Sequence, residues 1–594
     1  MLLRPGSFMA RASGVAFPSW VLAPGSDDAS LDIDFIGNRA YVAGATVTPA
    51  SILTCARASP ATTYYEQADG TLTTFAANVL RIGNLGLLVE ESRTNVVLHS
   101  RDLTNAAWVK LNCTAAKDQT GPDGTVNGAS KLTATAGNAT CLQSIVLASA
   151  ARWQSCYIKR ITGTGTIEMT MDAGMTWTAV TVTSSWDAVD IPTQTLANPT
   201  VGFRIVTSGD AVAIDFVQNE NDNLQRSSPI PTTTASVTRS ADDVQLTSQA
   251  WLNTGAMTIF TQGWSNVPND TTQGALWQMD HTSGSSLAFA RQGVSGMTHF
   301  GRNTAAATQW SATIDNASTG QPSTRRQKSV ISLATNDVAM IGVVGTITTD
   351  TSAAIPTDFS RVSVGSQRTS GFWNGYIERF STWASALSDT DISRLAAANC
   401  TFAVFVEGHS IPISPAVGTS FSGVLRTTLP IGYDTLVKAT SGATMATLTS
   451  RASALDTHFG HYRTMNPSGK HLTIVMIGYN DFAVDADSTA TFLSQLYAYT
   501  DARRAVGHRI VVVDPTPSTT AGFNTWRATV IADVAANVGV HLDYRINLSG
   551  TSIGADADAS DVAKYSDGIH PTAATAIVIA NAIRAQAIDV EAAL

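Results

Sequence analysis

The last third of the chain alternates between short apolar runs and longer segments of mixed polarity. Continuous apolar runs near Phe402–Val406 and Leu472–Ile477 are bounded by turn residues, a pattern typical of strands that are covered on both faces. Further strands are predicted near Thr435–Ala439, Arg509–Asp514 and Val540–Tyr544, and helices near Thr489–Val506, Thr525–Val538 and Ala573–Val590. Because helices and strands alternate, we predict an α/β domain with a parallel sheet and helices on both faces.

The first two thirds of the chain contain short alternating segments and no long helical pattern. Thr140–Val146 and Met257–Gln262 alternate apolar with polar positions, as the strands of a β-sandwich do. A chain of 594 residues is also too long for one hydrophobic core. These patterns predict four domains. Residues 1–95, 96–240 and 241–400 are expected to be β-rich and of sandwich type, and residues 401–594 are expected to be α/β. A Pro/Thr-rich linker is expected at Ser228–Thr234.

Composition narrows the classes of partner. Hydrophobic residues make up 44% of the chain and charged residues 14%, which suits globular packing, and the formal net charge is −9. No cluster of Lys and Arg is visible, which disfavours a nucleic-acid partner. No apolar run is long enough to span a membrane, and no secretory signal is expected because no sustained apolar stretch precedes Pro18.

The cysteines and histidines show no metal-ligand pattern. The chain has five cysteines, namely Cys55, Cys113, Cys141, Cys156 and Cys400. Reduced buried thiols are favoured, although Cys113 and Cys141 could face each other in a sandwich. His458 and His461 resemble a metal pair by spacing alone, without an evident third ligand. We therefore predict no metal and no cofactor.

Candidate chemistry begins where the first apolar run of the α/β domain ends. Glu407, Gly408, His409 and Ser410 lie there, and open α/β sheets place their chemistry at the carboxyl ends of strands. Ser410 is the candidate nucleophile, with a plain turn serine as the alternative. His409 could act as a second base, but neighbouring side chains of an extended backbone point to opposite faces, which disfavours this role.

Three later segments offer the partners that a serine nucleophile needs. Such a serine needs a base, the base needs an orienting acid, and the oxyanion needs hydrogen-bond donors. His570 can be the base, and Asp567, three residues before it, can hold the imidazole. The backbone N–H groups of Ser410 and Gly442 and the side-chain amide of Asn480 can form the oxyanion hole. A Ser–His dyad that Asp567 merely assists and a structural role for Asn480 are the alternatives.

The order of these segments resembles the SGNH hydrolases, also called the GDSL esterase/lipase family. Gly-x-Ser at Ser410 is followed by Gly442, by Gly-x-Asn-Asp at Asn480 and by Asp-x-x-His at His570, which is the order found in the family. The resemblance covers residues 401–594. It implies a flavodoxin-like, three-layer α/β fold, a serine esterase activity and the catalytic roles named above.

One position departs from the family pattern. Most members have Asp between the Gly and the Ser, and this chain has His409 there. In the family that Asp is mainly structural, so its replacement need not abolish activity. The resemblance therefore does not fix the geometry of the loop around Ser410.

Two segments near the N-terminus look like a module of tailed-phage structural proteins. Arg57-Ala58-Ser59 and the segment from Gly86 to Asn95, which contains Glu90 and Arg93, match the two elements that bracket that module. The resemblance implies a virion or prophage context for residues 1–95. The alternative is an ordinary β-domain in which Glu90 and Arg93 form a surface ion pair that contributes little stability.

The two middle domains resemble sandwiches that can bind glycans but are equally often structural spacers. Residues 96–240 look like a carbohydrate-binding jelly roll, and residues 241–400 look like a concanavalin-like, laminin-G-type sandwich that ends in a helix capped by Ser388, with Asp391 three residues on. The aromatics that could stack on sugar rings are Trp108, Trp153, Trp177 and Trp186. Most tryptophans of a sandwich belong to its core, and no acidic loop typical of a calcium site is visible.

These features lead to one favoured hypothesis and two alternatives. The favoured hypothesis is a phage or prophage tail-associated serine esterase, an O-acetylesterase that acts on a capsule, O-antigen or exopolysaccharide as the virion adsorbs. Its expected partners are that acetylated glycan and other tail proteins, and its expected location is the virion at the host surface. A homotrimer would suit a tail fibre or tailspike, although no coiled coil or β-helix repeat is visible. The alternatives are a non-catalytic receptor-binding or structural virion protein and a secreted bacterial polysaccharide esterase.

Overall fold

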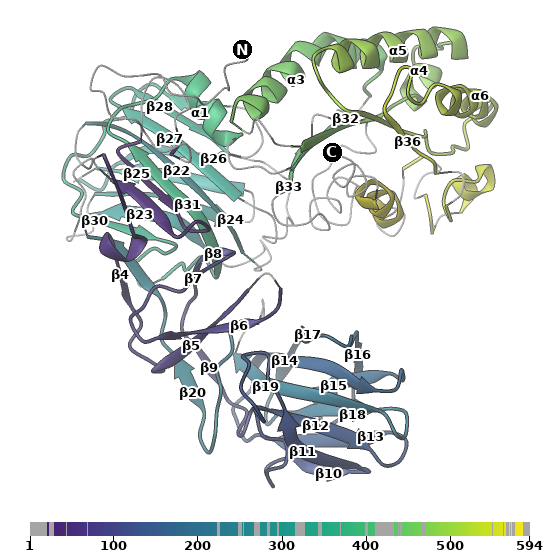
Figure 1. The fold of residues 1–594 in the computed structure, drawn as a ribbon. Coiled ribbons are helices and arrows are strands. Elements are labelled where there is room, and N and C mark those ends of the chain that lie inside the picture. Colours follow the sequence, from purple (N-terminus) through teal and green to yellow (C-terminus); the bar gives the residue numbers. More distant parts are fainter. Residues whose placement is uncertain are drawn as a thin grey trace.

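The computed structural model of the chain is β-rich in its first part and α/β in its last (Figure 1). The residues it describes are 21–22, 29–42, 44–67, 69–221, 226–247, 252, 255–265, 274–281, 286–293, 296–303, 305–314, 327–342, 347–368, 370–397, 402–409, 433–437, 439, 442–465, 470–548, 551–561, 563–565, 569–570, 572 and 576–585. Among the helices of these ranges, none has the length and apolar character needed to cross a membrane.

The larger sandwich consists of two facing antiparallel sheets. The order of the ten-stranded sheet is β29 (Thr348–Asp350), β28 (Asp337–Ile341), β27 (Gln327–Ala334), β22 (Ala256–Ser265), β31 (Gly375–Trp383), β1 (Leu31–Asp34), β2 (Arg39–Val42) and β3 (Ala45–Val47), with β8 (Gly86–Val89) on β31 and β7 (Ile82–Gly83) on β8. The order of the seven-stranded sheet is β26 (Thr308–Ile314), β25 (Gly296–Arg302), β24 (Leu287–Gly293), β23 (Ala275–Asp280), β30 (Arg361–Val364), β21 (Asp243–Leu246) and β4 (Leu53–Ala56).

Strands from both ends of the β-rich part share these two sheets. β1 and β8 both pair with β31, and β4, which follows the short 3-10 helix η1 (Pro49–Ser51), pairs with β21. The side chains of Ile33 and Val89 lie in the same core as those of Ile259, Trp277 and Ile377. The sequence led us to expect separate domains at residues 1–95 and 241–400, but in this topology strands from both ranges share the same two sheets. The pairing links residues hundreds of positions apart, which a local pattern cannot reveal.

A smaller sandwich is inserted between the strands of the larger one. Its sheets have the orders β10 (Val109–Leu111), β13 (Ala139–Ser144), β18 (Thr200–Ile205), β15 (Ile167–Thr170), β16 (Thr178–Val180), and β11 (Cys113–Gln119), β12 (Ala129–Ala134), β19 (Ala211–Asn221), β14 (Ala150–Thr162), β17 (Asp187–Leu196). Trp108 is buried in its core, whereas Trp153, Trp177 and Trp186 are partly exposed. Cys113 and Cys141 are free thiols, so the disulfide alternative is not realised.

A hairpin lies between the two sandwiches. It consists of β5 (Thr62–Glu66) and β6 (Leu72–Ala76), and Gly70 in the turn between them has a φ of +79°. Because successive residues of a strand point to opposite faces, Tyr64 packs on Phe216 of the smaller sandwich and Tyr65 packs on Tyr376 of the larger one. A second short ladder, β9 (Arg93–Asn95) with β20 (Val237–Arg239), lies at the same junction.

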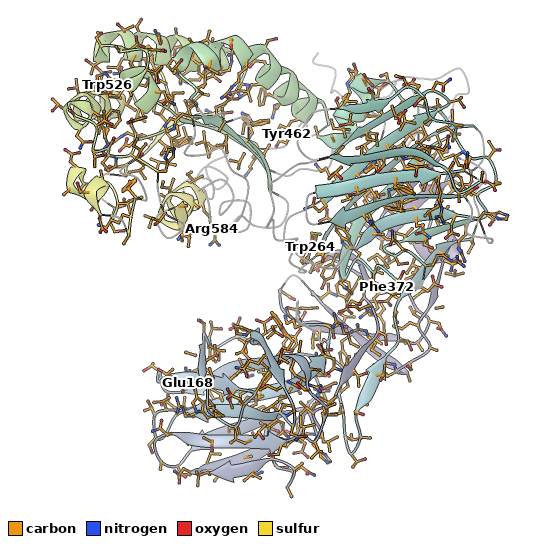
Figure 2. All side chains as sticks on the ribbon, turned by 180° about the vertical axis from the view of Figure 1, so that it is seen from behind. Glu168, Trp264, Phe372, Tyr462, Trp526 and Arg584 are labelled. Atoms are coloured by element: carbon orange, nitrogen blue, oxygen red, sulfur yellow. The ribbon has the colours of Figure 1, made fainter. Side chains whose placement is uncertain are left out.

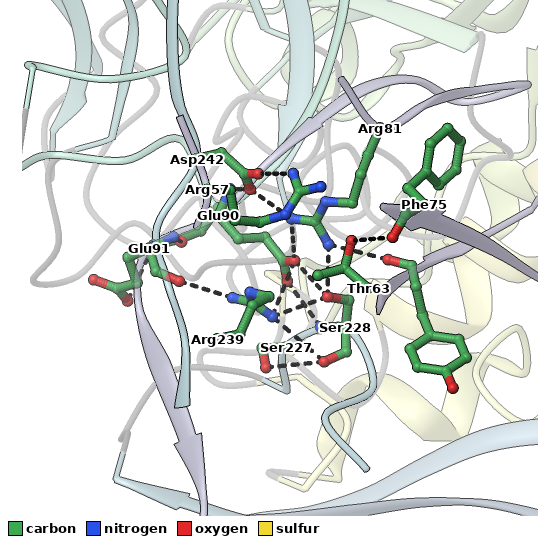
Figure 3. A network of polar contacts seen from close by, with 12 residues as sticks. Arg57, Thr63, Phe75, Arg81, Glu90, Glu91, Ser227, Ser228, Arg239 and Asp242 are labelled. Carbon is green, nitrogen blue, oxygen red and sulfur yellow. Dashed lines mark hydrogen bonds and ion pairs between the residues drawn. The ribbon is translucent and has the colours of Figure 1, made fainter. Parts of the chain in front are cut away.

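The two N-terminal motif segments meet in a buried polar network (Figure 3). The carboxylate of Glu90 lies 2.8 Å from Arg81 and 3.2 Å from Arg239, and Asp242 accepts from Arg57 at 2.5 Å. All of these side chains are buried. Burial alone would raise the pKa of Glu90, but the two arginines lower it to about 2.

The alternative interpretation, a surface ion pair between Glu90 and Arg93, is therefore wrong. Arg93 pairs with Glu91, and Glu90 is engaged inside the network. The residues of the motif thus join segments that are distant in sequence rather than decorating a surface.

The last part of the chain is the α/β domain expected from the sequence. Its five parallel strands have the order β33 (Tyr433–Val437), β32 (Phe402–Gly408), β34 (Lys470–Met476), β35 (Ile510–Val513) and β36 (Tyr544–Ile546). Numbered along the chain this is the 2-1-3-4-5 order of flavodoxin-like sheets. Its helices are α3 (Met445–Met465), α4 (Tyr479–Ala483), α5 (Thr489–Ala505), α6 (Phe523–Ala536) and residues 576–585, with the 3-10 helix η2 (Asp556–Ser560).

Helices cover both faces of this sheet. Val404 and Ile474 pack against Ile579 and Ile583 of residues 576–585 on one face. On the other face, side chains of β34 and β35 pack against α3, α5 and α6. Figure 2 shows the larger sandwich, with Trp264 and Phe372, between the smaller sandwich, with Glu168, and the α/β domain, with Arg584.

The predicted elements of the domain differ from the observed ones at two places. The sequence did not predict α3, and β36 begins at Tyr544, where the prediction for the strand ended. Gly539, at a φ of +86°, starts a turn, and this turn occupies the residues just before β36. The helix α1 (Asp389–Ala396), which precedes the domain, begins as predicted, because the Ser388 hydroxyl accepts from the Asp391 N–H at 3.2 Å.

Candidate active site

Gly442 and Asn480 follow the carboxyl ends of β33 and β34 in the parallel sheet. From β32 the chain passes to β33 on one side of it and then returns to β34 on the other. Connections that leave a strand in opposite directions open a crevice at the carboxyl ends, where α/β sheets bind their ligands. In this domain that switch in direction lies between the carboxyl ends of β32 and β34. His409 extends the ladder there, donating its backbone N–H to the Met476 carbonyl at 3.3 Å.

The structure describes three of the five predicted site residues. Gly442, Asn480 and His570 are placed, whereas Ser410 and Asp567 lie outside the described residues. Ser410 follows His409 directly in the sequence. The catalytic roles of Ser410 and Asp567 stay predictions.

Two of the three predicted oxyanion donors, Gly442 and Asn480, lie in segments that are bonded to each other. The side-chain amide of Asn480 donates to the Ala443 carbonyl at 3.1 Å, and Ala443 directly follows Gly442. Gly442 has a φ of +73°, a backbone conformation that side chains rarely adopt. An amide nitrogen carries two hydrogens, so this bond leaves a second one to donate. Asn480 thus supports the Gly442 turn and retains the capacity to bind an oxyanion.

Asp481 is a further residue at this edge, which the sequence offered only as part of the Gly-x-Asn-Asp segment. Its fully buried carboxylate accepts from the Met445 N–H at 2.7 Å, at the start of α3. Burial raises the pKa of this carboxyl to about 6. The sequence signal that could have identified Asp481 is its place in the polar turn three residues after Gly478. Gly478 has a φ of +125°, which requires glycine.

His570 lies close enough to the end of β32 to act on it electrostatically. Burial lowers the pKa of His409 to about 3, and His570 contributes to that shift. His409 is therefore a neutral, buried ring at neutral pH. A ring that binds protons so weakly is a poor general base, which agrees with the low weight given to His409 in that role.

An ion pair lies directly beneath the end of β32. Glu407 is fully buried, and its Oε2 lies 2.9 Å from Nε and 2.7 Å from Nη2 of Arg451 on α3. The same guanidinium donates to the Gly408 carbonyl at 3.4 Å. This arrangement connects α3 to the residues that immediately precede Ser410.

Buried arginines and carboxylates also hold the loops at this edge. Asp514, at the end of β35, accepts from Arg545 at 2.7 and 2.8 Å and is thus structural. Arg527 of α6 donates to the carbonyls of Pro515 at 2.6 Å and Gly554 at 2.8 Å. It therefore ties the loop after β35 to the segment that leads towards His570.

The other histidines have structural surroundings or are not described. His471 and His508 lie at the opposite, amino-terminal edge of the sheet, where His508 stacks on Phe459 with ring centroids 3.9 Å apart. The side chains of His458 and His461 lie outside the described residues. In the described part of the chain, no group of three His, Cys, Asp or Glu side chains is placed to hold a metal ion.

Comparisons with known proteins find similarity among solved structures. No protein-family model matches the chain, and no curated protein matches it either. Similar structures include a member of the lipolytic G-D-S-L family from Veillonella parvula (12% identity, TM-score 0.26, 32% of this chain and 100% of that one). Another is a lipase/acylhydrolase from Enterococcus faecalis (15% identity, TM-score 0.23, 31% and 94%). A third is a catalytic mutant of Axe2, an acetylxylan esterase from Geobacillus stearothermophilus (15% identity, TM-score 0.24, 32% and 95%). Similarity at this level does not assign a function to the chain.

Proposed function

We propose that the α/β domain is a serine esterase. The observation that carries this proposal is the bond between Asn480 and Ala443, which brings an amide donor and the Gly442 turn together beside the end of β32. An oxyanion hole needs donors fixed before the reaction, because donors that must reorient stabilise the developing charge less. The electrostatic effect of His570 on His409 supports a base at the same edge.

The reaction would proceed through an acyl-enzyme. The Ser410 hydroxyl oxygen attacks the ester carbonyl while His570 takes its proton, and Asp567 orients the imidazole. The oxyanion is held by the N–H groups of Ser410 and Gly442 and by the Asn480 amide. When the intermediate collapses, His570 returns the proton to the leaving alcohol. A water molecule, deprotonated by His570, then hydrolyses the acyl-enzyme.

The substrate class of this proposal is an acetylated polysaccharide on a bacterial surface. Two β-sandwiches precede the esterase domain, and such domains suit a polymeric substrate. The N-terminal motif segments favour a phage or prophage tail protein, whose partners would be the host glycan and other tail proteins. In that setting a homotrimer acting at the virion surface is the expected form.

A second candidate function is glycan binding without catalysis. His409, in place of the usual Asp, is the feature that favours it. Against it stands the joint presence of Ser410, Asn480, Asp567 and His570, for which a purely adhesive domain has no chemical need. A secreted bacterial polysaccharide esterase would use the same site and differs only in its biological setting.

The proposal is tested by hydrolysis of p-nitrophenyl acetate, butyrate and octanoate by the full chain and by Ser410→Ala. We expect activity on acetate that falls with acyl length and disappears in the variant. Acetate release from acetylated capsule or exopolysaccharide would then identify the polymer. Equal rates for the native chain and Ser410→Ala on every ester would contradict the proposal and favour the binding function.

A further inference from the structure

Glu407 occupies an unusual place for a charged residue. It lies in β32, the strand between β33 and β34, and is fully buried one residue before Gly408, where the strand ends. Burying a carboxylate is unfavourable unless it is paired and hydrogen-bonded. The packing of the sheet does not call for this charge, since Phe405, the preceding position on the same face of β32, is apolar and also buried.

Arg451 of α3 supplies the pairing and also reaches the backbone. Its guanidinium lies 2.7 and 2.9 Å from one carboxylate oxygen of Glu407, and it donates to the Gly408 carbonyl at 3.4 Å. Arginine offers several donors in a rigid plane, so one side chain can fix both groups at once. The end of β32 is thereby attached to α3 through two consecutive residues.

The same helix is attached to the neighbouring strand at its first residue. Asp481, just beyond the end of β34, accepts from the Met445 N–H at 2.7 Å, and Asn480 binds Ala443. The start of α3, which follows Gly442, is therefore fixed to the segment that carries Asn480. Its second turn is fixed to Glu407 and Gly408, which precede Ser410 in the sequence. The helix links the two halves of the candidate site.

We propose that Glu407 and Arg451 are positioning residues. Through α3, they hold the nucleophile in place relative to the Gly442 turn. This inference rests on the proposed esterase function and adds to it two residues outside the reacting groups. A misplacement of about 1 Å between a nucleophile and its partners can lower a rate by about 100-fold, so an ion pair at this point has a direct catalytic consequence.

The test compares single and double isosteric changes in the full chain. Glu407→Gln and Arg451→Met each leave one buried charge without its partner, so each is expected to lower the melting temperature by about 6 to 12 °C. The double variant removes both charges and is expected to recover most of that loss. If the pair positions Ser410, the kcat of the double variant for p-nitrophenyl acetate stays about 10- to 100-fold below native, with KM little changed.

A matched control is available on the same helix. Asp456 of α3 pairs with Arg503 of α5 at 2.9 Å, farther along α3 from the site. The double variant Asp456→Asn with Arg503→Met is expected to keep native kcat. A Glu407→Gln, Arg451→Met variant that is stable and has native kcat would overturn the inference.

Failure of the proposed function would look different: the native chain itself would then show no Ser410-dependent turnover on any ester.

Discussion

The side-chain amide of Asn480 has two roles, and its removal should lower turnover while the fold is kept. Its nitrogen donates to Ala443, and its second hydrogen is the proposed oxyanion donor. Loss of one such donor typically lowers turnover by about 100- to 1000-fold. Asn480→Ala is therefore expected to reduce kcat into that range on p-nitrophenyl acetate while its circular dichroism spectrum stays native. Native turnover in this variant would remove Asn480 from the mechanism.

Asp481 is expected to act through the start of α3. Asp481→Ala removes the acceptor of the buried Met445 N–H, which should cost about 1–3 kcal/mol of stability. Asp481→Asn keeps an acceptor oxygen and should lose less. Hydrogen exchange at the Met445 amide checks this directly, because only the Ala variant should accelerate it. Equal exchange in both variants would show that the bond does not stabilise this turn.

His471 and His508 make stability depend on pH. Burial lowers the pKa of His508 to about 3 and that of His471 to about 4, below the usual value of 6.5. The unfolded chain then binds more protons than the folded one at intermediate pH, so stability present above pH 6.5 is lost as the pH falls. Each ring contributes a slope of about 1.4 kcal/mol per pH unit between its two pKa values.

Urea unfolding of the native chain and His508→Gln between pH 7 and pH 5 measures this slope. The variant is expected to lose less stability than the native chain over that interval. His541→Gln is a suitable control, since His541 is partly exposed and pairs with Asp501. If native and His508→Gln chains show the same slope, His508 does not titrate as its buried position requires.

At the level of elements, the sequence predicts the α/β domain better than the β-rich part. β32, β34, β35, α5 and α6 lie within a few residues of their predicted positions because their apolar runs and caps are local signals. The helix α3 lacks such a signal, since threonines and small residues interrupt its apolar spacing. Its importance comes from contacts of Met445 and Arg451 with other elements, which only the fold provides.

The motif network provides a test at this scale. Removing the Glu90 carboxylate from between Arg81 and Arg239 leaves buried cations without their partner, so Glu90→Ala should cost about 3–5 kcal/mol. A surface ion pair would cost about 1 kcal/mol or less. Asp118→Asn, which breaks the exposed pair with Lys131, is the matched control. Similar melting temperatures for the two variants would contradict the buried role of Glu90.

At the scale of the whole molecule, the smaller sandwich is an insertion in the larger one. β8 and β21 flank it in sequence, and the sheets that contain them share one core. The larger sandwich therefore lies between the smaller one and the α/β domain (Figure 1). A linear reading of the sequence predicts consecutive domains because it cannot detect pairing between distant strands. The candidate site residues could be proposed from the sequence because they lie in short motifs. The contacts of Asp481, Glu407 and Arg451 could not, because they join distant segments.

The central claim, that Ser410 is a nucleophile activated by His570, is tested most directly by covalent labelling. A fluorophosphonate reacts with an activated serine, whose oxygen bonds to phosphorus as fluoride leaves. Peptide mass spectrometry of the labelled full chain is expected to find one adduct on the peptide that contains Ser410. The adduct should be absent in Ser410→Ala and strongly reduced in His570→Ala. Labelling that is unchanged in Ser410→Ala, or esterase activity that persists in it, would contradict the account.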